Sequence, residues 1–230
     1  MNFIDIIIII FVGCSCFQGY RRGFIKTLFD TIGLIVAFFL SKEFYYLVEE
    51  FLLTSTKLYD KVHNFFDAKS EKFYDIFNNG SNNIVQAFED ILKLPVEMQN
   101  LLSNIFNSGN TGNVDSYSVF VDSISTILVR TISFLITFLI IYIILVILSN
   151  IINTIFKLPV LNLTNRVFGG ITGVLKSIVV LYLIFALSSP LIGFMQDSNL
   201  AQSIIKSESS KIFYDNNIIL NYLSYKGFYQ

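Results

Sequence analysis

Four long apolar runs dominate the hydrophobic pattern of this chain. They cover residues 2–20, 24–40, 124–149 and 168–195. A helix over the first run would be about 28 Å long at 1.5 Å per residue, close to the hydrocarbon thickness of a bilayer. Only Arg21, Arg22 and Gly23 separate the first two runs, so the two helices must fold back tightly. The pattern predicts an all-α polytopic membrane protein whose four transmembrane helices form two hairpins.

Polar and acidic residues collect between the second and third runs and after the fourth. Residues 43–53 have apolar side chains at helical spacing, which predicts an amphipathic helix that lies on the membrane surface or continues the second span. Residues 84–94 repeat this pattern. We expect a helical layer outside the membrane, with one or two peripheral helices in the tail. The predicted parts are a first hairpin (1–41), a helical segment (42–123), a second hairpin (124–196) and a tail (197–230).

Two residues modify the predicted third and fourth spans. The third run is longer than a bilayer requires, so we expect its first turns to protrude and to let Arg130 reach the interface. Pro190 lies near the end of the fourth run and should end or kink that helix.

Composition excludes an ordinary soluble domain and gives no sign of a cofactor. Hydrophobic residues make up 53% of the chain and charged residues 14%, whereas about a quarter of residues are charged in soluble domains. The net charge of −1 implies no nucleic-acid partner. The chain has one histidine and two cysteines, and we interpret the cysteines as small apolar residues that fill space between helices. We therefore expect no metal site and no cofactor. The spans contain no histidine, and Asp5 and Asp30 lie near opposite membrane faces, so we expect no enzyme.

The distribution of basic residues predicts the orientation. Arg21, Arg22 and Lys26 flank the first short loop, and Lys157 and Arg166 lie in the second. The segment between the hairpins carries six lysines and twelve acidic residues. The positive-inside rule then places both short loops in the cytoplasm, and both termini and the acidic layer outside it.

The second and fourth runs resemble each other when Gly23 is aligned with Gly169. Asp30 and Lys176 then occupy the same place, seven residues further on, or about 10 Å along each helix. A lone charge at the bilayer centre costs about 2.5–3.5 kcal/mol on insertion scales. The first hypothesis is that Asp30 and Lys176 pair across the two helices. In the alternative, Lys176 reaches the cytoplasmic headgroups and Asp30 pairs with Lys26.

Small residues at four-residue spacing indicate close helix contacts near the same level. Gly169, Gly173 and Ser177 form one such ridge, and Gly19 and Gly23 are also four apart. Lipid provides no hydrophobic drive for helices to associate, so close approach of backbones at small residues matters more. The same ridges are compatible with a homo-oligomer.

Two segments carry a resemblance to a known family. The first runs from Gly19 through Arg21, Arg22 and Gly23 to Phe24, after an opening rich in isoleucine. The second combines an arginine, three glycines and a lysine: Arg166, Gly169, Gly170, Gly173 and Lys176. On these segments the chain resembles the CvpA (colicin V production protein) family of bacterial inner-membrane proteins over about residues 1–50 and 120–200. The resemblance implies a role linked to production of a secreted peptide toxin and to envelope homeostasis, without a defined activity.

Three classes of function remain to be compared. A non-enzymatic scaffold or accessory factor for toxin production, export or envelope homeostasis agrees best with few intramembrane charges and a docking layer. Its partners would be the lipid bilayer and other membrane or export proteins. The alternative is a small transporter or channel formed by oligomerisation, with Asp30 and Lys176 on its path. A membrane-embedded enzyme agrees least. Arg21 and Arg22 either fix topology and bind anionic headgroups or form the functional centre of the turn.

Overall fold

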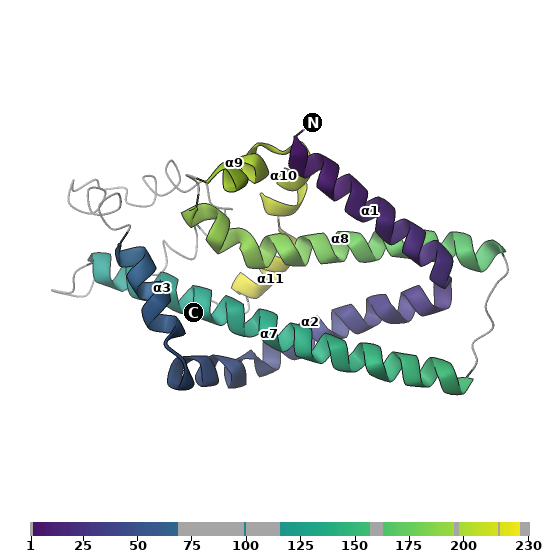
Figure 1. The fold of residues 1–230 in the computed structure, drawn as a ribbon, viewed down its shortest axis with the longest axis horizontal. Coiled ribbons are helices and arrows are strands. Elements are labelled where there is room, and N and C mark those ends of the chain that lie inside the picture. The colour runs from purple at the N-terminus through teal and green to yellow at the C-terminus, as the bar shows by residue number, and fades with distance from the viewer. Residues whose placement is uncertain are drawn as a thin grey trace.

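The computed structural model describes residues 2–68, 99, 116–156, 163–195, 198–215 and 217–225. Within these residues the chain is helical, with no strand. The helices in chain order are α1 (Phe3–Arg22), α2 (Phe24–Ser55), α3 (Leu58–Asp67), α7 (Ser116–Phe156), α8 (Leu163–Phe194), α9 (Asn199–Lys206), α10 (Glu208–Tyr214) and α11 (Ile218–Tyr225), as Figure 1 shows.

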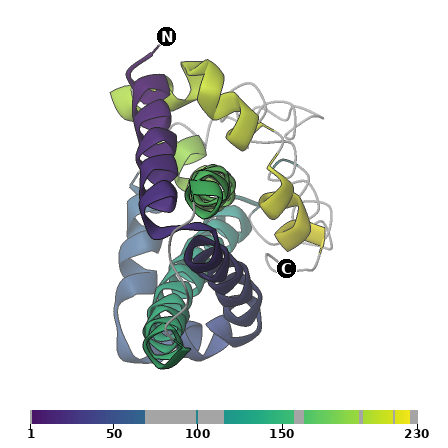
Figure 2. The same ribbon diagram turned by 90° about the vertical axis from the view of Figure 1, so that its right-hand side faces the viewer.

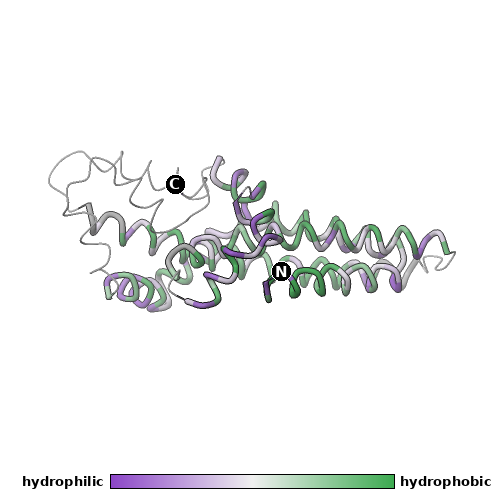
Figure 3. The backbone as a smooth tube through the Cα atoms, turned by 90° about the horizontal axis from the view of Figure 1, so that it is seen from above, coloured by the Kyte–Doolittle hydropathy of each residue, from purple (hydrophilic) through white to green (hydrophobic). Residues whose placement is uncertain are grey.

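Among the described residues, α1, α2, α7 and α8 are long and apolar enough to cross a membrane. Many of their large isoleucine, leucine and phenylalanine side chains remain exposed, as expected for surfaces that face lipid. Hydrophobic residues fill most of these four helices (Figure 3), whereas the short helices α3 and α9 are richer in polar residues. The prediction of an all-α membrane protein with four spanning helices is confirmed.

The structure sets the ends of the second and fourth spans. Residues 43–53 continue the second span, which is one of the two alternatives predicted for them, so α2 runs for 32 residues. Pro190 lies inside α8, which continues to Phe194. The tail contains three short helices in its described part, more than the one or two predicted. The predicted helix at residues 84–94 lies outside the described residues.

The spanning helices pack across the two predicted hairpins rather than within them. Helix α1 packs along α8 and α2 packs along α7, each pair antiparallel, while α2 and α8 run side by side in the same direction (Figures 1 and 2). Helices α1 and α2 are joined through Gly23 alone and then diverge, and α7 and α8 have few contacts with each other. The first helix of each half therefore packs on the second helix of the other half. This is the contact pattern of two repeats related by a two-fold axis along the bundle.

Glycines make the contact between α1 and α8 possible. A Cβ atom on Gly19 would overlap the carbonyl oxygen of Gly169, and one on Gly173 would overlap that of Ser15. A Cβ on Gly170 would make only an ordinary contact, 3.5 Å from Sγ of Cys16. Side chains at Gly19, Gly169 and Gly173 would force the two backbones apart. These glycines therefore allow the close contact between α1 and α8.

The start of α1 meets the tail helices α9 and α10 at the end of the bundle opposite the turn at Gly23. Asp5 is buried, and it accepts hydrogen bonds from the Ser207 hydroxyl (2.6 Å) and from the Ser209 backbone N–H (2.9 Å). The Asn2 side chain donates to the carbonyl of Ser203 (2.7 Å). A carboxylate is favourable at these positions because it satisfies the free N–H groups at helix N-termini. The tail is thereby attached to the start of α1.

Helix α11 packs into the bundle itself. Leu220 and Leu223 are fully buried in the main hydrophobic cluster, together with Phe38 of α2 and Phe134 of α7. Asn217 begins the helix by accepting from the Leu220 N–H (2.9 Å) and donates to a carbonyl of α8. The tail therefore contributes side chains to the core of the four-helix bundle.

Helix α3 is held against α7 by polar contacts. The Tyr59 hydroxyl donates to Asp122 (3.1 Å), whose carboxylate also lies 3.2 Å from Nε2 of His63. Burial and the neighbouring Asp122 carboxylate raise the pKa of Tyr59, so the hydroxyl remains a donor at neutral pH.

Candidate functional site

Helices α1, α2 and α8 surround a cavity of about 200 Å³ close to the end of the bundle where α1 ends and where α2 and α8 begin. We call this end the basic end, because Arg21, Arg22 and Arg166 lie there. The polar side chains that line the cavity come from all three helices: Ser15, Gln18, Arg22, Thr27, Asp30, Lys176 and Ser177. We call it the polar cavity. Polar side chains that cluster among otherwise apolar membrane helices are the clearest candidate for a functional site.

Three charged side chains meet in the polar cavity. Nη1 of Arg22 lies 2.7 Å from Oδ2 of Asp30, and Nζ of Lys176 lies 3.9 Å from the same oxygen. Asp30 is 7% exposed and Lys176 18%, whereas Arg22 is 42% exposed. The structure thus places Asp30 and Lys176 face to face across α2 and α8. The shorter contact is made by Arg22.

The ion cluster explains how the spans tolerate a carboxylate. A lone charge at the bilayer centre costs about 2.5–3.5 kcal/mol on insertion scales, and two cations near Asp30 offset part of that cost. Because one carboxylate meets two cations, the cluster carries a net charge of +1 when all three groups are ionised. Arg22, for which the sequence left open a role in topology and headgroup binding or at the functional centre of the turn, is part of this intramembrane cluster.

The turn that supplies Arg22 is built around Gly23 and Asn165. Gly23 has φ +83°, and its N–H donates to the Gly19 carbonyl (2.8 Å). Asn165 of α8 accepts the free N–H of Phe24 (3.0 Å), so it caps α2 from another helix. The Thr27 hydroxyl donates to the Gly23 carbonyl (2.8 Å). The sequence did not single out Asn165, because only the fold brings residues 24 and 165 together.

The remaining residues of the two family segments lie around this turn. Arg21 is exposed, and its guanidinium lies 5.8 Å from the centre of the Phe17 ring. Arg166 is half-buried near the start of α8. Gly169, Gly170 and Gly173 are on the side of α8 that contacts α1. The two segments predicted from the sequence therefore form one continuous region at the basic end.

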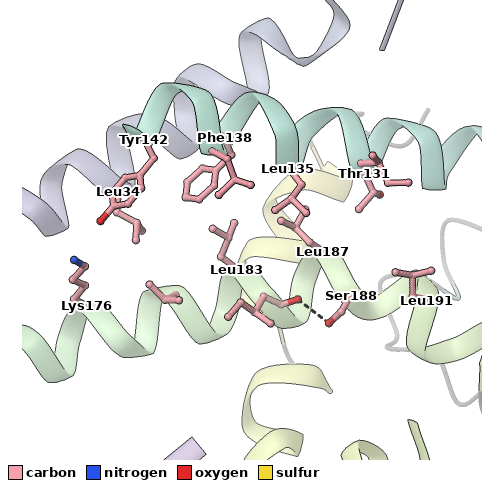
Figure 4. Close-up of a pocket in the computed structure, with 14 residues that line it drawn as sticks. Leu34, Thr131, Leu135, Phe138, Tyr142, Lys176, Leu183, Leu187, Ser188 and Leu191 are labelled. Atoms are coloured by element: carbon pink, nitrogen blue, oxygen red, sulfur yellow. Dashed lines mark hydrogen bonds between the residues drawn. The ribbon is translucent and has the colours of Figure 1, made fainter. Parts of the chain in front are cut away.

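A second space begins where the polar cavity ends. It is a groove of about 470 Å³ between α7 and α8 (Figure 4). Its walls are almost entirely apolar, and Lys176 lies at one end of it. Lys176 and Val180 line both the groove and the polar cavity. We call this space the α7–α8 groove.

Another ion pair joins α2 and α7 farther from the basic end. Nε of Arg130 lies 3.1 Å from Oε1 of Glu49, and the two side chains are 17% and 12% exposed. The Arg130 guanidinium also lies 5.9 Å from the centre of the Tyr45 ring. Arg130 was expected to reach the interface, and in the structure it pairs with Glu49 on the neighbouring helix α2.

The fold and the site define a class, namely a multi-pass α-helical membrane protein with an intramembrane ion cluster. The chain matches the model of the family described as Colicin V production protein over residues 4–77 and 99–215, and it belongs to that family of inner-membrane proteins. Arg22, Asp30, Asn165 and Lys176 all lie in the matched ranges, whereas α11 lies beyond them. The comparisons with curated proteins and with solved structures found no match.

Proposed function

We propose that this protein is a non-enzymatic scaffold or accessory factor that docks partners in toxin production, export or envelope homeostasis. One observation carries the proposal, namely that α2 and α7 pack together and are each longer than a bilayer requires. Helix α2 has 32 residues, or about 48 Å. Even at a tilt of about 40°, a span of about 30 Å uses only about 39 Å of helix.

Ion pairs and a hydrogen bond join the projecting part of α2 and α3 to α7, which suits a docking surface. The Glu49–Arg130 ion pair fixes α2 to α7 near its base, and the Asp122 contacts fix α3 to α7. Together with the tail helices that Asp5 attaches, these elements form what we call the outer layer. Rigid presentation lowers the entropy that a partner must lose on binding.

The orientation proposed for this layer is extracytoplasmic. Arg21, Arg22 and Arg166 lie at the basic end, and the positive-inside rule favours that end in the cytoplasm. Both chain termini and the outer layer would then lie outside the cytoplasm. This orientation agrees with a role in export or envelope maintenance.

The ion cluster also favours a non-enzymatic role. General-base catalysis requires a group that is free to accept a proton. Asp30 is instead engaged by Arg22 and Lys176, which both contact its Oδ2 atom.

A small transporter or channel formed by oligomerisation is the second candidate. It is supported by the polar cavity at membrane depth and by the repeat-like contacts of α1, α2, α7 and α8. Transporters of several folds bind their substrates between such repeats, near ionisable residues. In this reading Asp30 and Lys176 would lie on the path of the solute.

Photocrosslinking in the native membrane tests the docking role. A photoreactive phenylalanine analogue replaces Phe51, which is 60% exposed in the projecting part of α2. The matched control replaces Phe29, which is 52% exposed on the same helix within the span. We expect discrete protein adducts at position 51 and lipid adducts at position 29. Identical lipid adducts at both positions would contradict the scaffold, and adducts between copies at position 29 would favour the oligomeric transporter.

A further inference from the structure

The α7–α8 groove has the dimensions of a hydrocarbon-chain site. It extends along α8 from Lys176 to Leu191, or about 22 Å at 1.5 Å per residue. It is open to the side because α7 and α8 barely touch each other. Leu135, Leu139 and Ile184 on its walls are 41–50% exposed, so the groove faces the lipid phase.

Near the basic end of the bundle, the groove differs from an ordinary lipid-facing surface. Lys176 lines both the groove and the polar cavity, so it lies where the apolar groove meets the polar cavity. The Cα–Cβ bonds of a helix tilt towards its N-terminus, so the Lys176 stem leans towards the basic end, where headgroups lie. The net charge of +1 in the cluster is complementary to one anion.

We propose that the α7–α8 groove and Lys176 together bind one anionic phospholipid of the surrounding membrane. One acyl chain occupies the groove, and the headgroup phosphate lies against Lys176 and the exposed part of Arg22. Asp30 holds the two cations in place, and it leaves one positive charge for the phosphate. This site is independent of the outer layer, so it can be tested without reference to the docking role.

Tryptophan quenching provides the test, because the chain has no tryptophan of its own. Leu139→Trp places a single reporter in the groove, and Ile184→Trp places a second one on the opposite wall. Ile143→Trp is the matched control, because Ile143 is 56% exposed on α7 and does not line the groove. Each protein is reconstituted in phosphatidylcholine vesicles that contain a minor fraction of brominated phosphatidylglycerol or brominated phosphatidylcholine.

We expect both groove reporters to be quenched by the anionic lipid about fivefold more effectively than by the neutral one, since a basic residue near the surface favours anionic lipid by about 1 kcal/mol. The control reporter should show no preference. Lys176→Gln should abolish the preference while Asp30 keeps its contact with Arg22. Lys26→Gln removes a charge from the same end of α2 without lining either space, and it should leave the preference intact.

Three results would overturn the proposal. Equal quenching by both lipids at positions 139 and 184 means that the groove holds bulk lipid only. A preference that survives Lys176→Gln means that this lysine does not bind the headgroup. A preference that inorganic phosphate removes, when chloride at the same ionic strength does not, means that the cluster binds free phosphate rather than a lipid.

Discussion

Gly169 is the position where a single added carbon should damage the bundle most. A Cβ atom there would overlap the Gly19 carbonyl oxygen and would lie 2.7 Å from the carbonyl carbon and 2.9 Å from the Cα of Gly23. Carbon atoms pack best at about 3.5–4.0 Å, so α8 would have to move away by about 1 Å. All three contacts are with backbone, so no side chain can rotate to make room.

The cost follows from that displacement. A gap of about 1 Å removes up to about half of the dispersion energy at each contact that it opens, and overpacked sites typically lose about 1–3 kcal/mol. We expect Gly169→Ala to be less stable than its control by about 2 kcal/mol, or about thirtyfold in the unfolding equilibrium. The control is Gly13→Ala on α1, where a Cβ meets nothing within 4 Å. Both changes replace a helical glycine by alanine, so the gain in helix propensity cancels.

The assay is unfolding in mixed micelles with increasing sodium dodecyl sulfate, followed by circular dichroism. Gly169→Ala should unfold at a lower detergent fraction than the parent, and Gly13→Ala at the same or a higher fraction. If the two variants have equal stability, the close contact of α1 with α8 is not what holds the bundle together.

Three further predictions concern the tail, the turn and the second ion pair. Asp5→Asn removes charge-assisted hydrogen bonds worth about 2 kcal/mol, so the backbone amides of α10 should exchange hydrogen about thirtyfold faster. An unchanged exchange rate would show that Asp5 does not hold the tail to α1. Gly23→Ala should destabilise by about 2 kcal/mol, because φ is +83° and a Cβ would lie 2.6 Å from the Asn165 amide nitrogen; a neutral result in the micelle assay would contradict this. A double-mutant cycle of Glu49→Gln and Arg130→Met should give a coupling of about 1–3 kcal/mol, and additive effects would show that the pair is not formed.

The number and approximate positions of the spans could be predicted because they depend on local composition. So could the meeting of Asp30 with Lys176, since equal distance from a basic turn places two residues at equal depth. The glycine ridge on α8 was visible for a similar reason. In each case the information lies within one helix and in its distance from the membrane surface.

The pairing of helices could not be predicted in this way. A short turn at Gly23 suggests that α1 and α2 are neighbours, yet α1 packs on α8. Lipid tails are as apolar as leucine, so a hydrophobic face does not reveal which helix it contacts. The Asn165 cap on Phe24 and the Asp5 contact with Ser207 join residues 141 and 202 positions apart. Contacts of this kind depend on the complete fold, and no local sequence pattern predicts them.

Cysteine accessibility in intact cells tests the central claim most directly, namely that the basic end faces the cytoplasm and the outer layer faces away from it. In a protein with Cys14 and Cys16 replaced by serine, one cysteine is introduced at exposed Thr164 near the basic end, or at Leu200 on α9, which is 65% exposed. A membrane-impermeant maleimide should label Leu200→Cys in intact spheroplasts, and Thr164→Cys only after the membrane is opened. Labelling of Thr164→Cys from outside, with Leu200→Cys protected, would reverse the orientation and contradict the proposed role.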